Sequence, residues 1–389
     1  MLETWRWFGP RDPISLRQIA EAGATGIVTA LHHVPPGTAW TDAEIAERKA
    51  LIEAEGLRWE VVESIPTTNA VKSRTGGWSA DIEAWKQSLR ALGRAGVRTV
   101  CYNFMPIVDW TRTDLAYPMR SGLALRFDIV DFVAFDAFVL RRAGATGDYS
   151  ADVVKAASKR AMDMSEARKA ELERVVLAGL PGSTLGYDRS AFHGSLADFS
   201  GLSADDLRAN LIDFLRAVLP VAEEAGIRLA IHPDDPPIPL FGMPRVVSTA
   251  QDIGALLSAV PSASNGLTFC VGSLGSRADN DVVAMLREFA ARVNFLHLRN
   301  VSKDEAGSFV EAEHLGGDTD MVAVVEGVVT EERRRRDAGR DDAAIPMRPD
   351  HGHLLSADPT RNANPGYSYI GRLKGLAELR GVARALERN

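Results

Sequence analysis

The stretch Leu229-Ala230-Ile231-His232-Pro233-Asp234-Asp235-Pro236-Pro237 decides the fold of this chain. A short apolar run leads into a histidine, and a proline follows at once. Because proline has no backbone N–H to donate to a neighbouring strand, a buried strand over this run must end near Ile231 or His232. The pattern therefore predicts a strand over Arg228–His232. It puts His232 at the carboxyl end, where α/β folds place their catalytic and binding residues.

Seven further apolar runs are predicted to be strands, and amphipathic helical patterns separate nearly all of them. Helix starts at Thr41–Glu44 and Ser203–Asp206 precede two of these patterns. Eight strands that alternate with helices predict an α/β protein with the (β/α)₈ TIM-barrel fold. A doubly wound sheet is the alternative, but the chain has neither G-x-G-x-x-G nor G-x-x-x-x-G-K-[ST]. The predicted strands span Leu2–Phe8, Gly26–Leu31, Arg58–Glu63, Val97–Phe104, Arg228–His232, Gly266–Val271, Val293–Leu298 and Ile345–Pro349.

The alternation of strands and helices stops between residues of about 107 and 203. This segment has no clear strand pattern, and its main feature is a long polar helix predicted around Ala151–Leu177. We interpret residues 1–389 as a single TIM-barrel domain with a helical insertion after the fourth strand. An insertion at this place can cover or flank a site at the strand ends.

Composition narrows the classes of function. Hydrophobic residues make up 46% of the chain and charged residues 25%, which is ordinary for a globular protein. The formal net charge of −7 argues against nucleic acid as the main partner. No apolar run is long enough to cross a membrane, and Met1–Arg6 lacks the features of a signal peptide. With only two cysteines, Cys101 and Cys270, we expect a reduced, cytoplasmic protein.

Four potential metal ligands end the last four predicted strands: His232, Cys270, His297 and Asp350. In a barrel these strands are neighbours around one half of the ring, so their terminal side chains converge at the upper face. Two imidazoles, a thiolate and a carboxylate suit a divalent transition metal. A single strand histidine or cysteine is more often a packed core residue. Four at equivalent positions predict a metal site.

Other polar residues near the strand ends are less specific. His32 and His33 follow the second strand, and one of them faces the site, which makes His32 a candidate for substrate binding. Asp234-Asp235 is interpreted as a turn former before Pro-Pro, with metal or substrate binding as the alternative. His314 lies in the loop after the seventh strand, which is either a substrate clamp or simply solvated.

Several blocks of the sequence resemble the mannonate dehydratase family, from the first strand to the last helix. The resemblance is weakest across residues 140–200. It implies a xylose-isomerase-like TIM barrel that uses Mn²⁺ or Fe²⁺ and converts D-mannonate to 2-keto-3-deoxy-D-gluconate and water in hexuronate (glucuronate) catabolism. The matching blocks are Glu3–Gly9, Val61–Pro66, Cys101–Pro106, Asp109–Asp114, His232–Pro237, His297–Asn300, Arg348–Gly352 and Asn364–Tyr367.

The resemblance implies the same four metal ligands that the strand ends indicate. The chain departs from the family pattern in two places. Thr67-Thr68-Asn69 follows Ser64-Ile65-Pro66, where the family usually has a His-Glu pair. The loop Ser183–His193 is also unusual. The first departure affects contacts that the loop after the third strand makes with the substrate or with the metal ligands. The second affects the shape of a lid over the site.

Dehydrating a sugar acid removes a proton beside the carboxylate and expels hydroxide from the neighbouring carbon. Negative charge develops in both steps, and a metal ion and cationic side chains stabilise it. A base must take the proton, and an acid must protonate the leaving oxygen. His351, next to Asp350, and Tyr367, after a Pro-Gly turn, are the candidates for proton transfer.

The substrate carboxylate calls for a cationic partner. Arg299 and Arg348 lie beside the metal strands and are candidates for that role. Alternatively, these arginines pair structurally with Asp234 or Asp235. Asn103, in the block after the fourth strand that resembles the family, is a further candidate for substrate binding.

Three alternatives remain. A metal-dependent sugar isomerase or epimerase keeps the barrel, but such barrels rely more on carboxylate ligands. A metal-dependent phosphodiesterase acting on damaged nucleic acid would need more ligands and a basic surface. A non-catalytic sugar-acid binder would not need ligand-rich strand ends. We expect a small sugar acid as substrate, no nucleic-acid or membrane partner, and a homo-oligomer of two or more copies.

Overall fold

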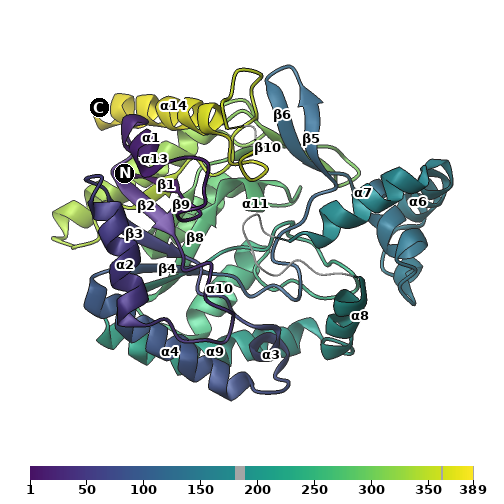
Figure 1. The fold of residues 1–389 in the computed structure, drawn as a ribbon, viewed down its shortest axis with the longest axis horizontal. Coiled ribbons are helices and arrows are strands. Elements are labelled where there is room, and N and C mark those ends of the chain that lie inside the picture. The colour runs from purple at the N-terminus through teal and green to yellow at the C-terminus, as the bar shows by residue number, and fades with distance from the viewer. Residues whose placement is uncertain (180–188, 361, 389) are drawn as a thin grey trace.

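The computed structural model describes residues 1–179, 189–360 and 362–388. Its centre is a closed barrel of eight parallel strands (Figure 1), in the order β1-β12-β9-β8-β7-β4-β3-β2. The predicted (β/α)₈ fold and all eight predicted strands are confirmed. The barrel strands are β1 (Leu2–Arg6), β2 (Gly26–Thr29), β3 (Arg58–Glu63), β4 (Thr99–Tyr102), β7 (Arg228–Ile231), β8 (Asn265–Cys270), β9 (Val293–His297) and β12 (Pro346–Arg348).

Helices surround the barrel, and two of them begin as the sequence predicts. In α2 (Asp42–Glu53) the Thr41 side chain accepts from the backbone N–H of Glu44, and the Glu44 side chain accepts from the backbone N–H of Thr41. The same reciprocal pair, Ser203 with Asp206, begins α9 (Ala204–Glu224). Each such cap contributes about 1 kcal/mol to helix stability. The other helices around the barrel are α1 (Leu16–Glu21), α3 (Asn69–Ser73), α4 (Trp78–Ala95), α10 (Ala250–Ala259), α11 (Val271–Gly275), α12 (Val282–Phe289), α13 (Met321–Asp337) and α14 (Tyr369–Glu387).

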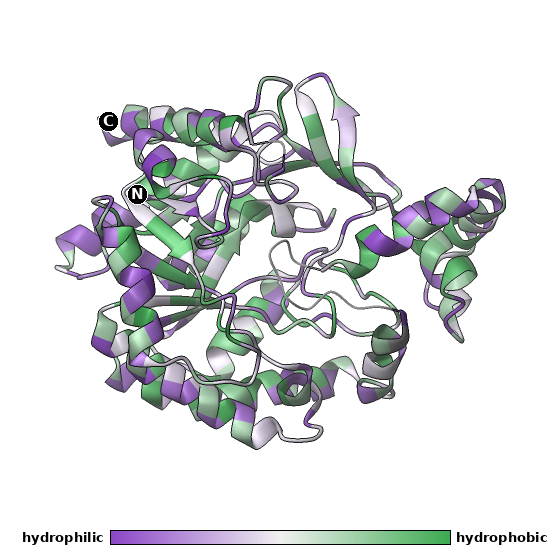
Figure 2. Ribbon diagram, in the orientation of Figure 1, coloured by the Kyte–Doolittle hydropathy of each residue, from purple (hydrophilic) through white to green (hydrophobic). Residues whose placement is uncertain are grey.

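The hydrophobic core of the barrel has two layers. The larger layer lies between the strands and the surrounding helices, and Figure 2 shows the barrel strands as mostly hydrophobic, whereas the helices also carry hydrophilic residues. A small cluster from alternate strand positions fills the barrel interior: Val28, Val61, Cys101, Ala230 and Phe295. Phe295 lies two residues before His297 on the same face of β9, and the two ring centroids are 4.7 Å apart. The His297 side chain therefore packs directly against the interior cluster.

A second, four-stranded sheet adjoins the barrel, in the order β10-β11-β6-β5. It combines a hairpin of β5 (Asp114–Met119) and β6 (Gly122–Phe127) with the loop strands β10 (Asn300–Lys303) and β11 (Phe309–Ala312). The expectation that residues 107–203 contain no strand is therefore wrong. Pro118 obscures the strand pattern. It is tolerated because β5 is the edge strand, whose outer side forms no hydrogen bonds with another strand.

The rest of the insertion is helical, as predicted. The long helix expected over Ala151–Leu177 is two helices, because Met164 is extended and the Ser165 side chain caps a new helix by accepting from the backbone N–H of Arg168. The inserted helices are α5 (Ile129–Val133), a π-helical turn (Ala134–Val139), a short 3₁₀ turn (Ala145–Gly147), α6 (Ala151–Asp163), α7 (Glu166–Leu177) and α8 (Arg189–Asp198).

Helices α6 and α7 project away from the barrel (Figure 1). The loop Ser183–His193 lies outside the described residues as far as residue 188, and its last five residues begin α8. None of the described helices combines the length and the apolar character that crossing a membrane requires.

Candidate metal centre at the carboxyl ends of the strands

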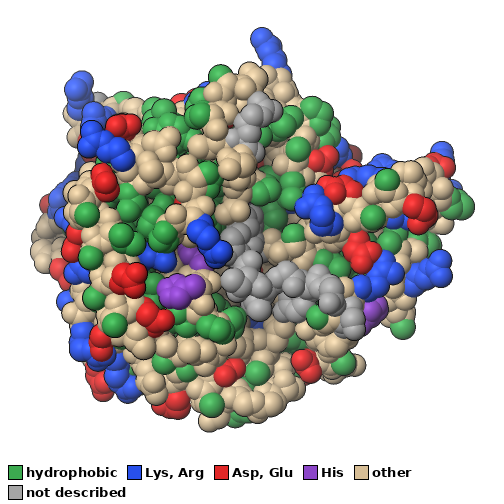
Figure 3. All heavy atoms as spheres, in the orientation of Figure 1, with side chains coloured by type: hydrophobic (Ala, Val, Ile, Leu, Met, Phe, Trp, Pro, Cys, Tyr) green, Lys and Arg blue, Asp and Glu red, His purple; other side chains and the backbone are tan. Residues whose placement is uncertain are grey.

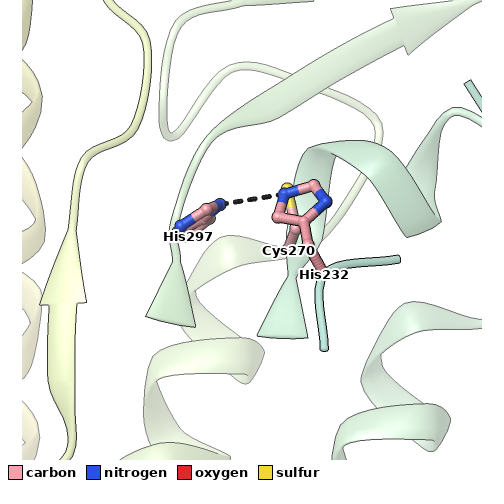
Figure 4. A group of neighbouring side chains, drawn as sticks. All are labelled: His232, Cys270 and His297. Carbon is pink, nitrogen blue, oxygen red and sulfur yellow. Dashed lines mark hydrogen bonds between the residues drawn. The ribbon is translucent and has the colours of Figure 1, made fainter. Parts of the chain in front are cut away.

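Three of the predicted ligands meet at the ends of three adjacent strands (Figure 4). His232 follows β7 directly, Cys270 ends β8 and His297 ends β9, where the register pairs Cys270 with His297. One ligand atom of each residue lies within 4.8 Å of the corresponding atoms of the other two. Proline at 233 ends the first strand as the sequence indicates, and this delivers His232 to the cluster.

The His232 ring is oriented as a metal-binding imidazole would be. Its Nδ1 donates to the backbone carbonyl of Pro233 at 2.6 Å, which leaves Nε2 facing Nδ1 of His297 at 3.1 Å. Metal-ligating histidines commonly fix their second nitrogen on a carbonyl or a carboxylate in this way. Burial lowers the pKa of His232, but Cys270 outweighs that effect and raises it to about 9. An ion bound here takes the place of this proton, since ligands must be deprotonated.

His297 has a carboxylate behind it. Its Nε2 lies 3.5 Å from Oε1 of Glu63, the last residue of β3. Glu63 also accepts from Nη2 of Arg348 at 2.8 Å, so its position is fixed. A carboxylate behind a ligating histidine orients the ring and raises its basicity.

The surroundings of Cys270 favour its thiolate. Burial alone raises the pKa of this thiol, but Arg299 and His232 outweigh burial and hold the pKa well below its ordinary value. The hydroxyl of Ser273 also donates to Sγ at 3.1 Å. The thiolate is the form that binds metal. The donor set therefore fits a divalent transition ion.

Asp350, the fourth predicted ligand, lies just outside the cluster. Its Oδ2 is 3.9 Å from both Sγ of Cys270 and Nδ1 of His297. The carboxylate accepts from Nε of Arg299 at 2.7 Å and from Nη1 of Arg348. The structure thus brings together three of the four predicted ligands and holds the fourth on two arginines within reach of them.

Arg299 and Arg348, the predicted substrate-binding arginines, are both paired with protein carboxylates. Arg299 donates to Asp350, to Asp235 and, at 3.2 Å, to Glu311. Arg348 donates to Asp350 and Glu63, and its Nε donates to Nε2 of His297 at 3.2 Å. For Arg299, the structure contains the ion pair with Asp235 that the sequence left open as an alternative to substrate contact.

The interpretation of Asp234-Asp235 as a turn former holds for its first residue only. Asp234 Oδ2 accepts from the backbone N–H of Val247 at 2.8 Å and from the hydroxyl of Ser248 at 2.7 Å, so it organises the local loop. Asp235 is fully buried among the arginines. Burial alone would raise its pKa, but Arg112 and Arg299 outweigh burial and lower it.

Arg112, from the insertion, ties that segment to the barrel. Its guanidinium lies between the rings of Trp110 and Phe309, at 4.6 Å and 4.9 Å from their centroids. It donates to Asp235 at 2.7 Å and to Glu311 at 2.8 Å, and none of its side-chain surface is exposed. A planar fork between two aromatic faces has little freedom to move, so this contact is rigid.

Arg112→Met is expected to destabilise the protein by about 3–5 kcal/mol, because it leaves the buried carboxylates of Asp235 and Glu311 short of a counter-charge. Denaturant unfolding measures the change. Arg174→Met is the matched control in the same insertion. Arg174 pairs with Glu171 on the exposed surface of α7, where such pairs contribute at most about 1 kcal/mol. Equal losses in the two variants would contradict the anchoring role of Arg112.

The two candidate proton-transfer residues lie together beside the cluster. The rings of His351 and Tyr367 meet edge to face, with centroids 4.9 Å apart. Nδ1 of His351 is 2.8 Å from both carboxylate oxygens of Glu311, and its Nε2 lies 3.7 Å from Oδ1 of Asp350. Burial raises the pKa of Tyr367 to about 12. Its phenol therefore stays protonated at neutral pH and is suited to donate a proton.

The two remaining predicted residues lie farther from the cluster. His32 is half-buried, and Nη2 of Arg6 donates to its Nε2 at 3.4 Å. Burial, with Arg6 and Arg48 nearby, lowers the pKa of His32 to about 3, so the ring is neutral. Figure 3 shows one face of the molecule, on which histidine side chains are exposed next to acidic and basic side chains. Asn103 follows β4 and is half-buried, and no hydrogen bond joins it to the other described residues of the site.

Two carboxylates around the site, Glu63 and Glu311, were not predicted from the sequence, and a third, Asp235, was assigned mainly to a turn. Glu63 was detectable, because it ends a barrel strand as the ligands do. Asp235 was noticed but assigned to a turn. Glu311 gave no signal, since it belongs to β11, which was not predicted.

Known proteins match this chain along its whole length. The D-mannonate dehydratase (UxuA) family profile matches residues 1–389. Mannonate dehydratase 2 of Agrobacterium fabrum is 55% identical over 389 residues, which is 100% of this chain and 98% of the relative. Mannonate dehydratase of Saccharophagus degradans is 54% identical with the same coverage.

Solved structures agree with the fold. The crystal structure of mannonate dehydratase from Streptococcus suis serotype 2 superposes with a TM-score of 0.76 at 35% identity and covers 100% of this chain and 94% of that one. A xylose isomerase-like TIM barrel protein from Mycobacterium smegmatis gives a TM-score of 0.51 at 15% identity, over 100% of this chain and 96% of that one. This second likeness shows the fold alone.

Proposed function

The chain belongs to the D-mannonate dehydratase family, and from this premise we propose that it removes water from D-mannonate at a metal centre built on His232, Cys270 and His297. It is a hydro-lyase, and the product of the reaction is 2-keto-3-deoxy-D-gluconate. The observation that supports the metal centre is the convergence of these two imidazoles and one thiolate at the ends of adjacent strands. A sugar isomerase or epimerase on the same barrel is not favoured.

The proposed ion is Mn²⁺ or Fe²⁺, with Asp350 as the fourth protein donor. When bound, the ion polarises a substrate oxygen and stabilises the negative charge that develops during dehydration. Asp350 lies 3.9 Å from two of the other ligands. Its present partners, Arg299 and Arg348, are then the nearest cations for the substrate carboxylate, which guanidinium groups bind as a fork.

His351 and Tyr367 are proposed to move the protons. Nδ1 of His351 faces Glu311, so Nε2 is the atom available to take or give a proton on the side of Asp350. The phenol of Tyr367, which packs against the His351 ring, is the proposed donor that protonates the leaving hydroxide. Both side chains are buried, which excludes bulk water from the proton transfers. His32 and Asn103 are the proposed contacts for the rest of the sugar acid.

Stripping and restoring the metal tests this function. We expect the chelated protein to release no 2-keto-3-deoxy acid from D-mannonate, and added Mn²⁺ or Fe²⁺ to restore the activity. A panel of other aldonates and of keto- and aldo-sugars should be run in parallel. Product from chelated protein would exclude the metal mechanism. Epimerised sugars without keto-deoxy acid would favour the isomerase alternative. The cytoplasmic location and the homo-oligomeric state stay predictions.

A further inference from the structure

Glu311 is a buried carboxylate to which the proposed mechanism gives no step of its own. It lies on β11 of the small sheet, and only 3% of its surface is exposed. Both of its oxygens lie 2.8 Å from Nδ1 of His351. The same carboxylate accepts from Arg112 at 2.8 Å and from Arg299 at 3.2 Å.

We infer that Glu311 is the positioning residue for His351, and this inference rests on the proposed function. An ionised carboxylate can only accept hydrogen bonds, so Nδ1 of His351 must carry a proton and donate it. With Nδ1 donating, the tautomer that this contact selects is the one whose Nε2 bears the lone pair. That nitrogen is on the side of the ring that faces Asp350, at 3.7 Å from Oδ1. Glu311 thereby sets both the angle and the tautomer of the ring.

Glu311 is itself held from three directions, as a positioning group must be. Arg112 and Arg299 fix its carboxylate, and Nε2 of His353 donates to its backbone carbonyl at 2.8 Å. Burial alone raises the pKa of Glu311, but His351 and Arg299 outweigh burial and lower it to about 2. The two guanidinium contacts therefore favour the ionised form of the carboxylate.

The small sheet explains how a residue so far along the chain reaches this place. Strand β11 pairs with β6 of the inserted hairpin through Phe309↔Phe127 and Val310↔Arg126. Side chains alternate along a strand, so Phe309 and Glu311 share one face, and both contact Arg112. The insertion is thus part of the support for the proposed proton-transfer group.

Glu311→Gln is the direct test. The amide can present its NH₂ to Nδ1, which permits the other tautomer, so we expect kcat to fall by about 10²-fold with KM little changed. Glu311→Asp keeps the charge and should recover part of the loss. In a His351→Ala background, Glu311→Gln should change kcat by less than about 3-fold, because residues that act as one unit are not additive. An equal loss of kcat in both backgrounds would show a merely structural role and overturn the inference.

A second measurement does not depend on turnover. In ¹⁵N-histidine NMR spectra of protein loaded with diamagnetic Zn²⁺, with the His351 signals assigned by their loss in His351→Ala, the wild type should show the Nδ1–H tautomer and Glu311→Gln should lose it. Asp235→Asn is the control. It removes a charge from the same two arginines but does not touch His351, so the His351 signals should stay in place.

The two measurements separate the possible failures. An Nε2–H tautomer in the wild type would overturn the assignment of Glu311 even if D-mannonate is dehydrated. The expected tautomer in a protein that forms no product would uphold the Glu311–His351 contact, while the proposed reaction would fall.

Discussion

Cys270→Ser is expected to remove both the bound metal and the dehydration of D-mannonate. Serine keeps the size of the side chain, but its hydroxyl stays protonated at neutral pH and is a poor ligand. Loss of a partner outside the ligand set already costs 10–100-fold in metal affinity or activity, so we expect less than about 1% of wild-type activity. Metal content by mass spectrometry and release of keto-deoxy acid are the two measurements.

The chain offers a matched control, because its other cysteine is equally buried. Cys101 lies in the barrel interior, where its Sγ accepts from the hydroxyl of Thr268 at 3.1 Å. Cys101→Ser should keep its metal and its activity, with at most a modest loss of stability. Full metal occupancy in Cys270→Ser would make Cys270 a core thiol and would remove the ligand set on which the proposed function rests.

His351→Ala and Tyr367→Phe are expected to lower kcat by about 10²–10⁴-fold while the protein keeps its metal, because general acids and bases contribute that much to rate. This pattern, activity lost with metal retained, separates them from the ligand variants. Steady-state kinetics together with metal analysis of the same samples measures it. Near-normal turnover in both variants would exclude these residues from the proton transfers.

Tyr369→Phe is the matched control for Tyr367→Phe. Tyr369 is two residues further along the chain, and its hydroxyl donates to the backbone carbonyl of Gln18 at 3.1 Å, outside the site. We expect kcat of this variant to stay near the wild-type value. A comparable loss in both tyrosine variants would indicate damage to the segment that leads into α14 and not to a proton donor.

The barrel could be predicted because its signals are local. Prolines and polar residues end the apolar runs, and reciprocal caps such as Thr41 with Glu44 begin the helices. The small sheet could not be predicted, since its strands gain their stability from pairing across a long stretch of sequence. Pro118 hides β5, and β11 is short and carries Glu311 on its inward face. Local sequence patterns therefore predict the barrel better than they predict the small sheet beside it.

The ligand cluster was predictable for the same reason, as a strand end is visible in sequence and parallel strand ends converge. The charge network was not. Whether Arg299 meets a substrate or Asp235 depends on groups that four separate segments bring together, and sequence order does not contain that information. The position of Asp350 on two arginines, beside the cluster and not within it, has the same origin.

The pairing of β6 with β11 sets a limit on protein engineering. The insertion after β4 is the obvious segment to delete from a minimal scaffold, because it projects from the barrel and contributes none of the candidate ligands. Such a truncation would leave β11 with an unpaired edge and would remove Arg112, so Glu311 would lose part of its support. By the proposed mechanism, the shortened chain would keep its candidate metal-binding residues and yet be a poor catalyst. Engineering of the insertion should therefore spare the hairpin.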